Sequence, residues 1–88
     1  MGLFVVSYDL IKRKEYQPLW DEMKRLGGHK PVESVYLLNL NLDSASAVRD
    51  HFKTFIDEDD LLIVAKFVGK PSFLKAKSGT NAWIDKNC

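Results

Sequence analysis

The amino-acid sequence predicts an α+β domain with six elements in the order strand, helix, strand, strand, helix, strand. Two runs, residues 3–9 and 34–40, are apolar on both faces of a strand and therefore belong in the middle of a sheet. A proline confines the short strand at residues 29–33 to an edge. This arrangement is the ferredoxin-like βαββαβ sandwich, a four-stranded antiparallel sheet with two helices on one face.

The first strand, residues 3–9, ends abruptly in an acid. Its side chains alternate between two faces that are both largely apolar, so both faces should be covered. Asp9 then lies at the carboxyl end of a central strand, where sheets of α/β type tend to hold their chemistry. Aspartate is also common in strand-to-helix connections for structural reasons alone, and a turn residue is therefore the alternative reading.

The first helix follows a short polar connection. Apolar residues recur at helical spacing along one face: Tyr16, Leu19, Trp20, Met23 and Leu26. Pro18 fits only the first turn of this helix, and Gly27-Gly28 supplies a left-handed stop.

The rest of the domain repeats this pattern. After the strands at residues 29–33 and 34–40, Asp43 or Ser44 should cap the second helix. That helix is marked by Val48, Phe52, Phe55 and Ile56. The acids at 57–60 oppose the helix dipole and should lie beyond its last turn. Residues 61–68 form the last strand, which Gly69 and Pro71 close.

We divide the chain into a ferredoxin-like domain over residues 1–69 and a C-terminal segment over residues 70–88. The segment is basic, yet it carries Phe73, Leu74, Trp83 and Ile84, which make it too apolar for a disordered tail. We expect it to pack on the domain or on a dimer partner.

The composition predicts a cytoplasmic protein without a membrane partner. No apolar run approaches the roughly 20 residues that a membrane span needs. The first residues lack the basic start and cleavage site of a signal peptide. Cys88 is the one cysteine of the chain, which leaves no pair for a disulfide framework and no cysteine set for zinc.

The net charge of +1 argues neither for nor against nucleic acid, but the charges are unevenly distributed. Lys12-Arg13-Lys14 follows shortly after Asp9, and the chain between Asp60 and Asp85 holds four lysines and no acid. Such clusters are compatible with phosphate contacts and equally with solvated surface.

Two helices cover only one face of a four-stranded sheet. The strands are apolar on both faces, so apolar side chains must be exposed on the open face. A second copy of the chain is the simplest cover, and we expect a homodimer built through the open sheet face.

Three segments resemble the Cas2 family of small CRISPR-associated adaptation proteins. Residues 4–9, Phe-Val-Val-Ser-Tyr-Asp, resemble the first strand of that family. Residues 34–36, Ser-Val-Tyr, are similar to its Ser-Val-Phe/Tyr strand, and residues 60–64 to its last core strand. The similarity in order and spacing covers roughly residues 3–68 and is shared with stand-alone SinR-like and virulence-associated protein D-like relatives.

The resemblance implies a ferredoxin-like homodimer and a possible magnesium-dependent endonuclease that hydrolyses phosphodiesters of RNA or DNA. It assigns Asp9 as the catalytic residue and the metal ligand, with a second copy contributed by the dimer mate. Two carboxylates across a two-fold axis suit a hydrated Mg²⁺. In this reading Lys12, Arg13, Lys14 and Arg25 lie near the phosphates.

The second hypothesis is a non-catalytic dimeric module that binds nucleic acid or a protein. A scaffold of an adaptation complex and a toxin–antitoxin component are examples of such a module. Magnesium-dependent cleavage, measured with and without Asp9→Ala, discriminates between the two hypotheses.

Overall fold

The computed structural model describes residues 2–11 and 16–88. The elements are β1 (Gly2–Asp9), α1 (Gln17–Arg25), β2 (His29–Val32), β3 (Val35–Leu40), α2 (Ala45–Phe52), the 3-10 helix η1 (Lys53–Phe55), β4 (Leu61–Phe67) and α3 (Thr80–Asn87). Each of the six predicted elements is present, and the acids at 57–60 lie beyond η1, as expected.

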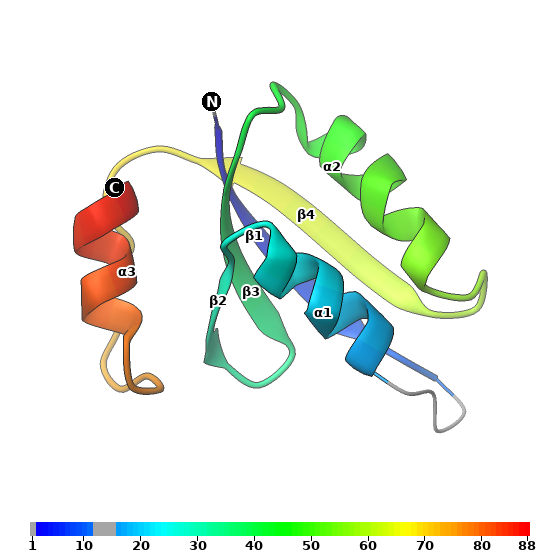
Figure 1. The fold of residues 1–88 in the computed structure, drawn as a ribbon, viewed down its shortest axis with the longest axis horizontal. Helices are drawn as coiled ribbons and strands as arrows, with labels where there is room; N and C mark the ends of the chain where they lie inside the picture. Colours follow the sequence, from blue (N-terminus) through cyan, green and yellow to red (C-terminus); the bar gives the residue numbers. More distant parts are fainter. Residues whose placement is uncertain (1, 12–15) are drawn as a thin grey trace.

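The strands form one antiparallel sheet in the order β2-β3-β1-β4 (Figure 1). The prediction that the first and third strands are central and that the proline-bearing strand lies at an edge is therefore confirmed. Ser7 of β1 pairs with Val35 on one side and with Ile63 on the other, which fixes the faces of all three strands. The arrangement is that of the ferredoxin-like fold.

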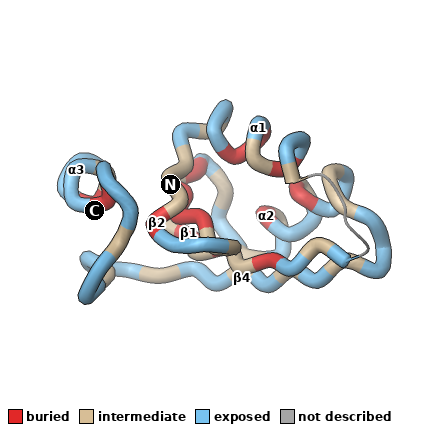
Figure 2. Tube along the Cα trace, turned by 90° about the horizontal axis from the view of Figure 1, so that it is seen from below, coloured by how far each residue is buried: buried red, intermediate tan, exposed pale blue. Residues whose placement is uncertain are grey.

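Helices α1 and α2 cover one face of the sheet (Figures 1 and 2). The alternate residues Phe4, Val6 and Tyr8 of β1 point to this side and are buried, because the strand period sends every second side chain to the same face. The core between the layers is completed by Leu19, Met23, Leu38, Val48 and Phe52.

Local sequence signals set the ends of both helices. Pro18 lies in the first turn of α1, and Gly27 follows the helix with φ +80°, a conformation that favours glycine. Of the two candidate caps for α2, the structure selects Ser44, whose Oγ accepts a hydrogen bond from Ala47 N at 3.2 Å.

A third helix, α3, lies beside the edge strand β2, away from α1 and α2 (Figures 1 and 2). Its contacts are with residues that share the open face: His29 Nε2 is 2.7 Å from Thr80 Oγ1, and Asn39 Nδ2 donates to Asn87 Oδ1. Ile84 is buried, and Trp83 Nε1 donates to Gly27 O at 2.8 Å. No described helix has the length and apolar character needed to cross a membrane.

The sequence predicts two helices and assigns no element to residues 70–88, where the structure has α3. Helix α3 escaped prediction because it spans only eight residues and buries little besides Ile84 and Thr80, so its sequence shows no apolar periodicity. Its presence divides the open face of the sheet. The half over β2 and β3 is covered by α3, whereas the half over β1 and β4 leaves Leu61 58 % and Ile63 68 % exposed.

Candidate functional site

Asp9 lies at the carboxyl end of β1 with its residue exposed. It is paired with Leu61 in the sheet and shares the open face with Ser7, two residues earlier. These residues line a shallow hollow of about 210 Å³ together with Tyr8, Leu62 and Ile63. The acid therefore stands at the end of the exposed half of the sheet, beside apolar side chains.

Tyr8, the neighbour of Asp9, points to the opposite side of the sheet. Its hydroxyl lies in the layer below α1, where it accepts a hydrogen bond from Trp20 Nε1 at 2.6 Å. Burial raises the pKa of Tyr8 to about 12, so the phenol stays protonated. Tyr8 therefore anchors the strand under the helix and has no access to the open face.

Asp60 holds the backbone around the acidic end of β1. One carboxylate oxygen accepts from Ile11 N at 2.8 Å, and the other accepts from Asp57 N at 2.8 Å. The exit of β1 is thus tied to the entrance of β4, which fixes the position of Asp9 between them. Through these two bonds Asp60 supports the backbone at the end of β1.

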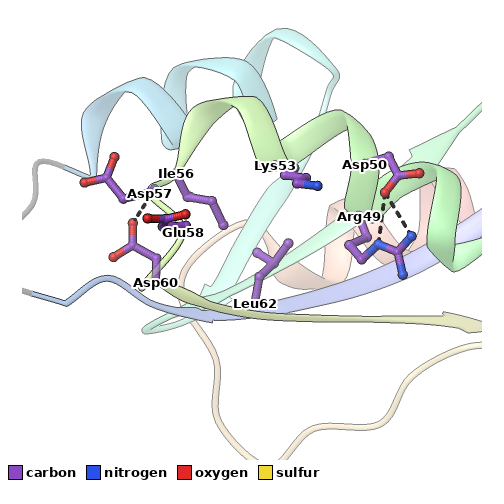
Figure 3. A pocket seen from close by; sticks show the side chains of 8 residues that line it. All are labelled: Arg49, Asp50, Lys53, Ile56, Asp57, Glu58, Asp60 and Leu62. Carbon is purple, nitrogen blue, oxygen red and sulfur yellow. Dashed lines mark hydrogen bonds and ion pairs between the residues drawn. The ribbon is translucent and has the colours of Figure 1, made fainter.

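A larger hollow of about 480 Å³ lies between α2, η1 and β4 (Figure 3). Its cationic end holds Arg49, which is paired with Asp50 at 2.9 Å, and its acidic end holds Asp60, which binds backbone amides. Lys53 and the apolar residues Ile56 and Leu62 lie between them. These bonds of Arg49 and Asp60 are made within the fold, and we do not place the functional site in this groove.

Of the four predicted phosphate-binding residues, Arg25 is the one that lies in the described part of the chain. Lys12, Arg13 and Lys14 lie outside the described residues. Arg25 ends α1, which begins near the end of β1 and runs back along it, so Arg25 and Asp9 lie at opposite ends of this unit (Figure 1). The structure does not bring these two residues together.

Arg25 instead belongs to a polar cluster that sequence reasoning missed. Its guanidinium donates to both carboxylate oxygens of Glu22, at 2.7 and 2.6 Å, and His51 Nε2 lies 2.6 Å from the same carboxylate. The hydrogen bond from Arg25, with a smaller contribution from His51, lowers the pKa of buried Glu22 to about 2 although burial acts in the opposite direction. The ionised carboxylate only accepts, so His51 Nε2 donates.

This cluster makes the stability of the fold depend on pH. The pKa of Glu22 is about 2 in the folded chain and 4.5 in the unfolded chain. The ionised carboxylate therefore contributes fully to the free energy of unfolding above pH 4.5, and this contribution is lost as the pH falls toward 2. We expect Glu22→Gln to lower the free energy of unfolding at pH 7 by about 1.5–3 kcal/mol. In denaturant melts, the difference in free energy of unfolding between Glu22→Gln and the unmodified chain should shrink as the pH falls from 4.5 to 2. Asp50→Asn, in an exposed pair, should have a small effect at every pH.

One protomer offers little to a metal ion. Among residues 2–11 and 16–88, no group of three His, Cys, Asp or Glu side chains is placed to hold one. Asp9 supplies one exposed carboxylate at the open face. Mg²⁺ is commonly held by one or two carboxylates together with waters and substrate phosphates, so Asp9 fits this ion only as part of a shared site.

Comparison with known proteins identifies one family. The sequence model of the family described as CRISPR associated protein Cas2 matches residues 1–75, which include the whole sheet, α1 and α2. No solved structure matches the chain.

Proposed function

The chain belongs to the family of the CRISPR associated protein Cas2, and we propose that it acts in CRISPR adaptation as a homodimer that binds nucleic acid. In this proposal the two Asp9 carboxylates form a shared magnesium site for phosphodiester hydrolysis. The observation that carries the proposal is the position of Asp9 at the end of the exposed apolar half of the sheet.

The exposed half of the open face supports the proposed dimer. Leu61 and Ile63 are 58 % and 68 % exposed on β4, and Val5 lies beside them on β1. A two-fold contact through this surface covers the apolar side chains of both copies at once. An axis near the Asp9 end of the strands places two carboxylates within reach of one ion.

The residues of this chain have distinct roles in the proposed site. Asp9 holds the ion, and the Ser7 hydroxyl, on the same face, can hydrogen-bond a water or a phosphate oxygen. Bound Mg²⁺ neutralises phosphate charge and activates a water. Lys12, Arg13 and Lys14 supply the phosphate contacts, whereas Arg25 is left out because Glu22 occupies its guanidinium.

A non-catalytic binding module is the second candidate. The observation in its favour is that no three His, Cys, Asp or Glu side chains among the described residues are grouped to hold a metal ion, while the Tyr8 hydroxyl is buried under α1. Such a protein uses the same dimer and the same cations but cuts nothing. Its binding should weaken steeply with salt, as phosphate contacts do.

The unmodified protein tests the proposal. Sedimentation at micromolar concentration should give about twice the chain mass of 10.1 kDa. Single-stranded RNA or duplex DNA should be cleaved in Mg²⁺ and left intact in EDTA. A clean monomer would contradict the dimer and its shared site together. A dimer that binds but does not cleave either substrate would select the non-catalytic candidate.

A further inference from the structure

We propose that the hollow between β2, α3 and the chain that leads into α3 docks an acidic segment of another protein through one large apolar side chain. This surface, here the β2 hollow, is lined by Pro31, Val32, Leu37, Phe73, Ala76 and Ile84. The inference is independent of magnesium and of Asp9, which lies at the end of β1 in a different hollow.

The walls of the β2 hollow come from three parts of the chain. Pro31 and Leu37 form its sheet side, α3 contributes Ile84, and the segment before α3 contributes Phe73 and Ala76. The backbone bond from Lys77 N to Pro31 O, 2.7 Å long, holds that segment against β2. The volume of about 200 Å³ suits a single large side chain better than a nucleotide or a helix.

Apolar groups remain open at the rim of this hollow. Val32 and Phe73 are each 43 % exposed, and the next residue, Leu74, is 96 % exposed. An aromatic side chain beside a preformed apolar hollow is typical of protein–protein contact sites. An apolar anchor entering the hollow would cover these groups.

The charges around the hollow specify the partner. Two acids next in sequence to residues that line the hollow are each paired with a lysine: Glu33 with Lys77 at 2.6 Å, and Asp85 with Lys70 at 3.4 Å. Lys75 lies between those two lysines in the sequence and is exposed, and the segment from 61 to 84 contains no acid. Because the acid and the lysine of each pair balance each other's charge, exposed Lys75 leaves the rim with a net positive charge around an apolar centre, which complements an apolar anchor flanked by carboxylates.

Docking at the β2 hollow leaves the proposed dimer face free. The exposed Leu61 and Ile63 lie on β4, at the opposite edge of the sheet from β2. A dimer could therefore carry one such partner on each outer side.

A synthetic peptide, acetyl-Asp-Glu-Asp-Leu-Phe-Asp-Glu-amide, tests the proposal in a titration of the ¹⁵N-labelled full chain followed by NMR. We expect saturable shifts at Val32, Phe73, Ala76 and Ile84. Replacing the acids of the peptide by lysine, or its Leu-Phe by alanine, should weaken binding at least tenfold.

Variants of the chain locate the contact. Ala76→Leu should fill the hollow and abolish binding, and Lys75→Glu should weaken it at least fivefold. The control Lys53→Glu makes the same charge change in the groove beside α2 and should alter affinity less than twofold. The dimer mass should be unchanged in all three.

Four results would overturn the proposal. They are no saturable shift at millimolar peptide, equal binding of the lysine peptide, shifts confined to Leu61 and Ile63, and dissociation of the dimer by Ala76→Leu. The third and fourth would assign the surface to contact between copies. A duplex oligonucleotide that shifts the hollow residues in place of the peptide would assign it to nucleic acid.

Discussion

Asp9→Asn should lower magnesium-dependent cleavage by at least about 100-fold, since a metal ion supplies several kcal/mol of charge stabilisation and each 1.4 kcal/mol is a factor of ten. Asparagine keeps the shape of the side chain and removes the charge that holds the cation. Asp9 is exposed, and its side chain makes no hydrogen bond with residues 2–11 or 16–88, so folding and dimer mass should not change. Initial cleavage rates at saturating Mg²⁺, with circular dichroism and sedimentation on the same preparations, measure these effects.

The matched control is Asp43→Asn. Asp43 is also exposed and precedes the α2 cap, away from the end of β1, so its neutralisation should leave cleavage unchanged. If Asp9 is only a turn residue, asparagine satisfies the same backbone geometry and both variants should cut alike. Wild-type cleavage by Asp9→Asn, with contaminating nuclease excluded, would rule out the metal site. If the unmodified chain and both variants bind nucleic acid but none of them cleaves it, the result would favour the non-catalytic binding module.

The sheet could be predicted because its signals are local. A run that is apolar on both faces must be covered on both sides, and this requirement placed β1 and β3 in the middle. The pairing of Ser7 with Val35 and with Ile63 confirms the central position of β1. Pro31 has no N–H to donate and so restricted β2 to an edge. The position of Asp9 could also be predicted, because Asp9 is the last residue of the apolar run that forms β1.

The features that escaped prediction depend on tertiary contacts. Glu22 and His51 are 29 residues apart and meet only when α1 packs beside α2. The spacing of Glu22 and Arg25 is compatible with a helical ion pair, but such spacing is common on solvated faces and predicts no burial. Helix α3 is held by contacts of Thr80 and Trp83 with residues more than 50 positions earlier in the sequence. The periodicity of apolar residues within a short segment cannot reveal such contacts. The division of the open face by α3 follows from these contacts.

Ile63→Asp should convert the proposed dimer into a monomer. In a two-fold contact each substitution occurs twice, and each places an unpaired carboxylate against the apolar side chains of the other copy. Burying a charge without a partner costs several kcal/mol, so the dissociation constant should rise at least about 100-fold, which corresponds to about 2.8 kcal/mol. Ile63 is 68 % exposed in the single chain, so the monomer should remain folded. Sedimentation across a concentration series measures the shift.

Thr54→Asp adds the same charge on η1, an exposed position on the helical side of the sheet, and should leave the dimer intact. Ile63→Lys should dissociate the dimer as Ile63→Asp does, because loss of apolar contact and burial of charge act regardless of sign. Each monomer keeps its Asp9 unchanged but lacks the second carboxylate, so cleavage should fall together with association. A folded Ile63→Asp monomer that cleaves at the wild-type rate would show that one Asp9 suffices. An Ile63→Asp dimer of unchanged affinity would move the interface away from the β1–β4 half of the sheet.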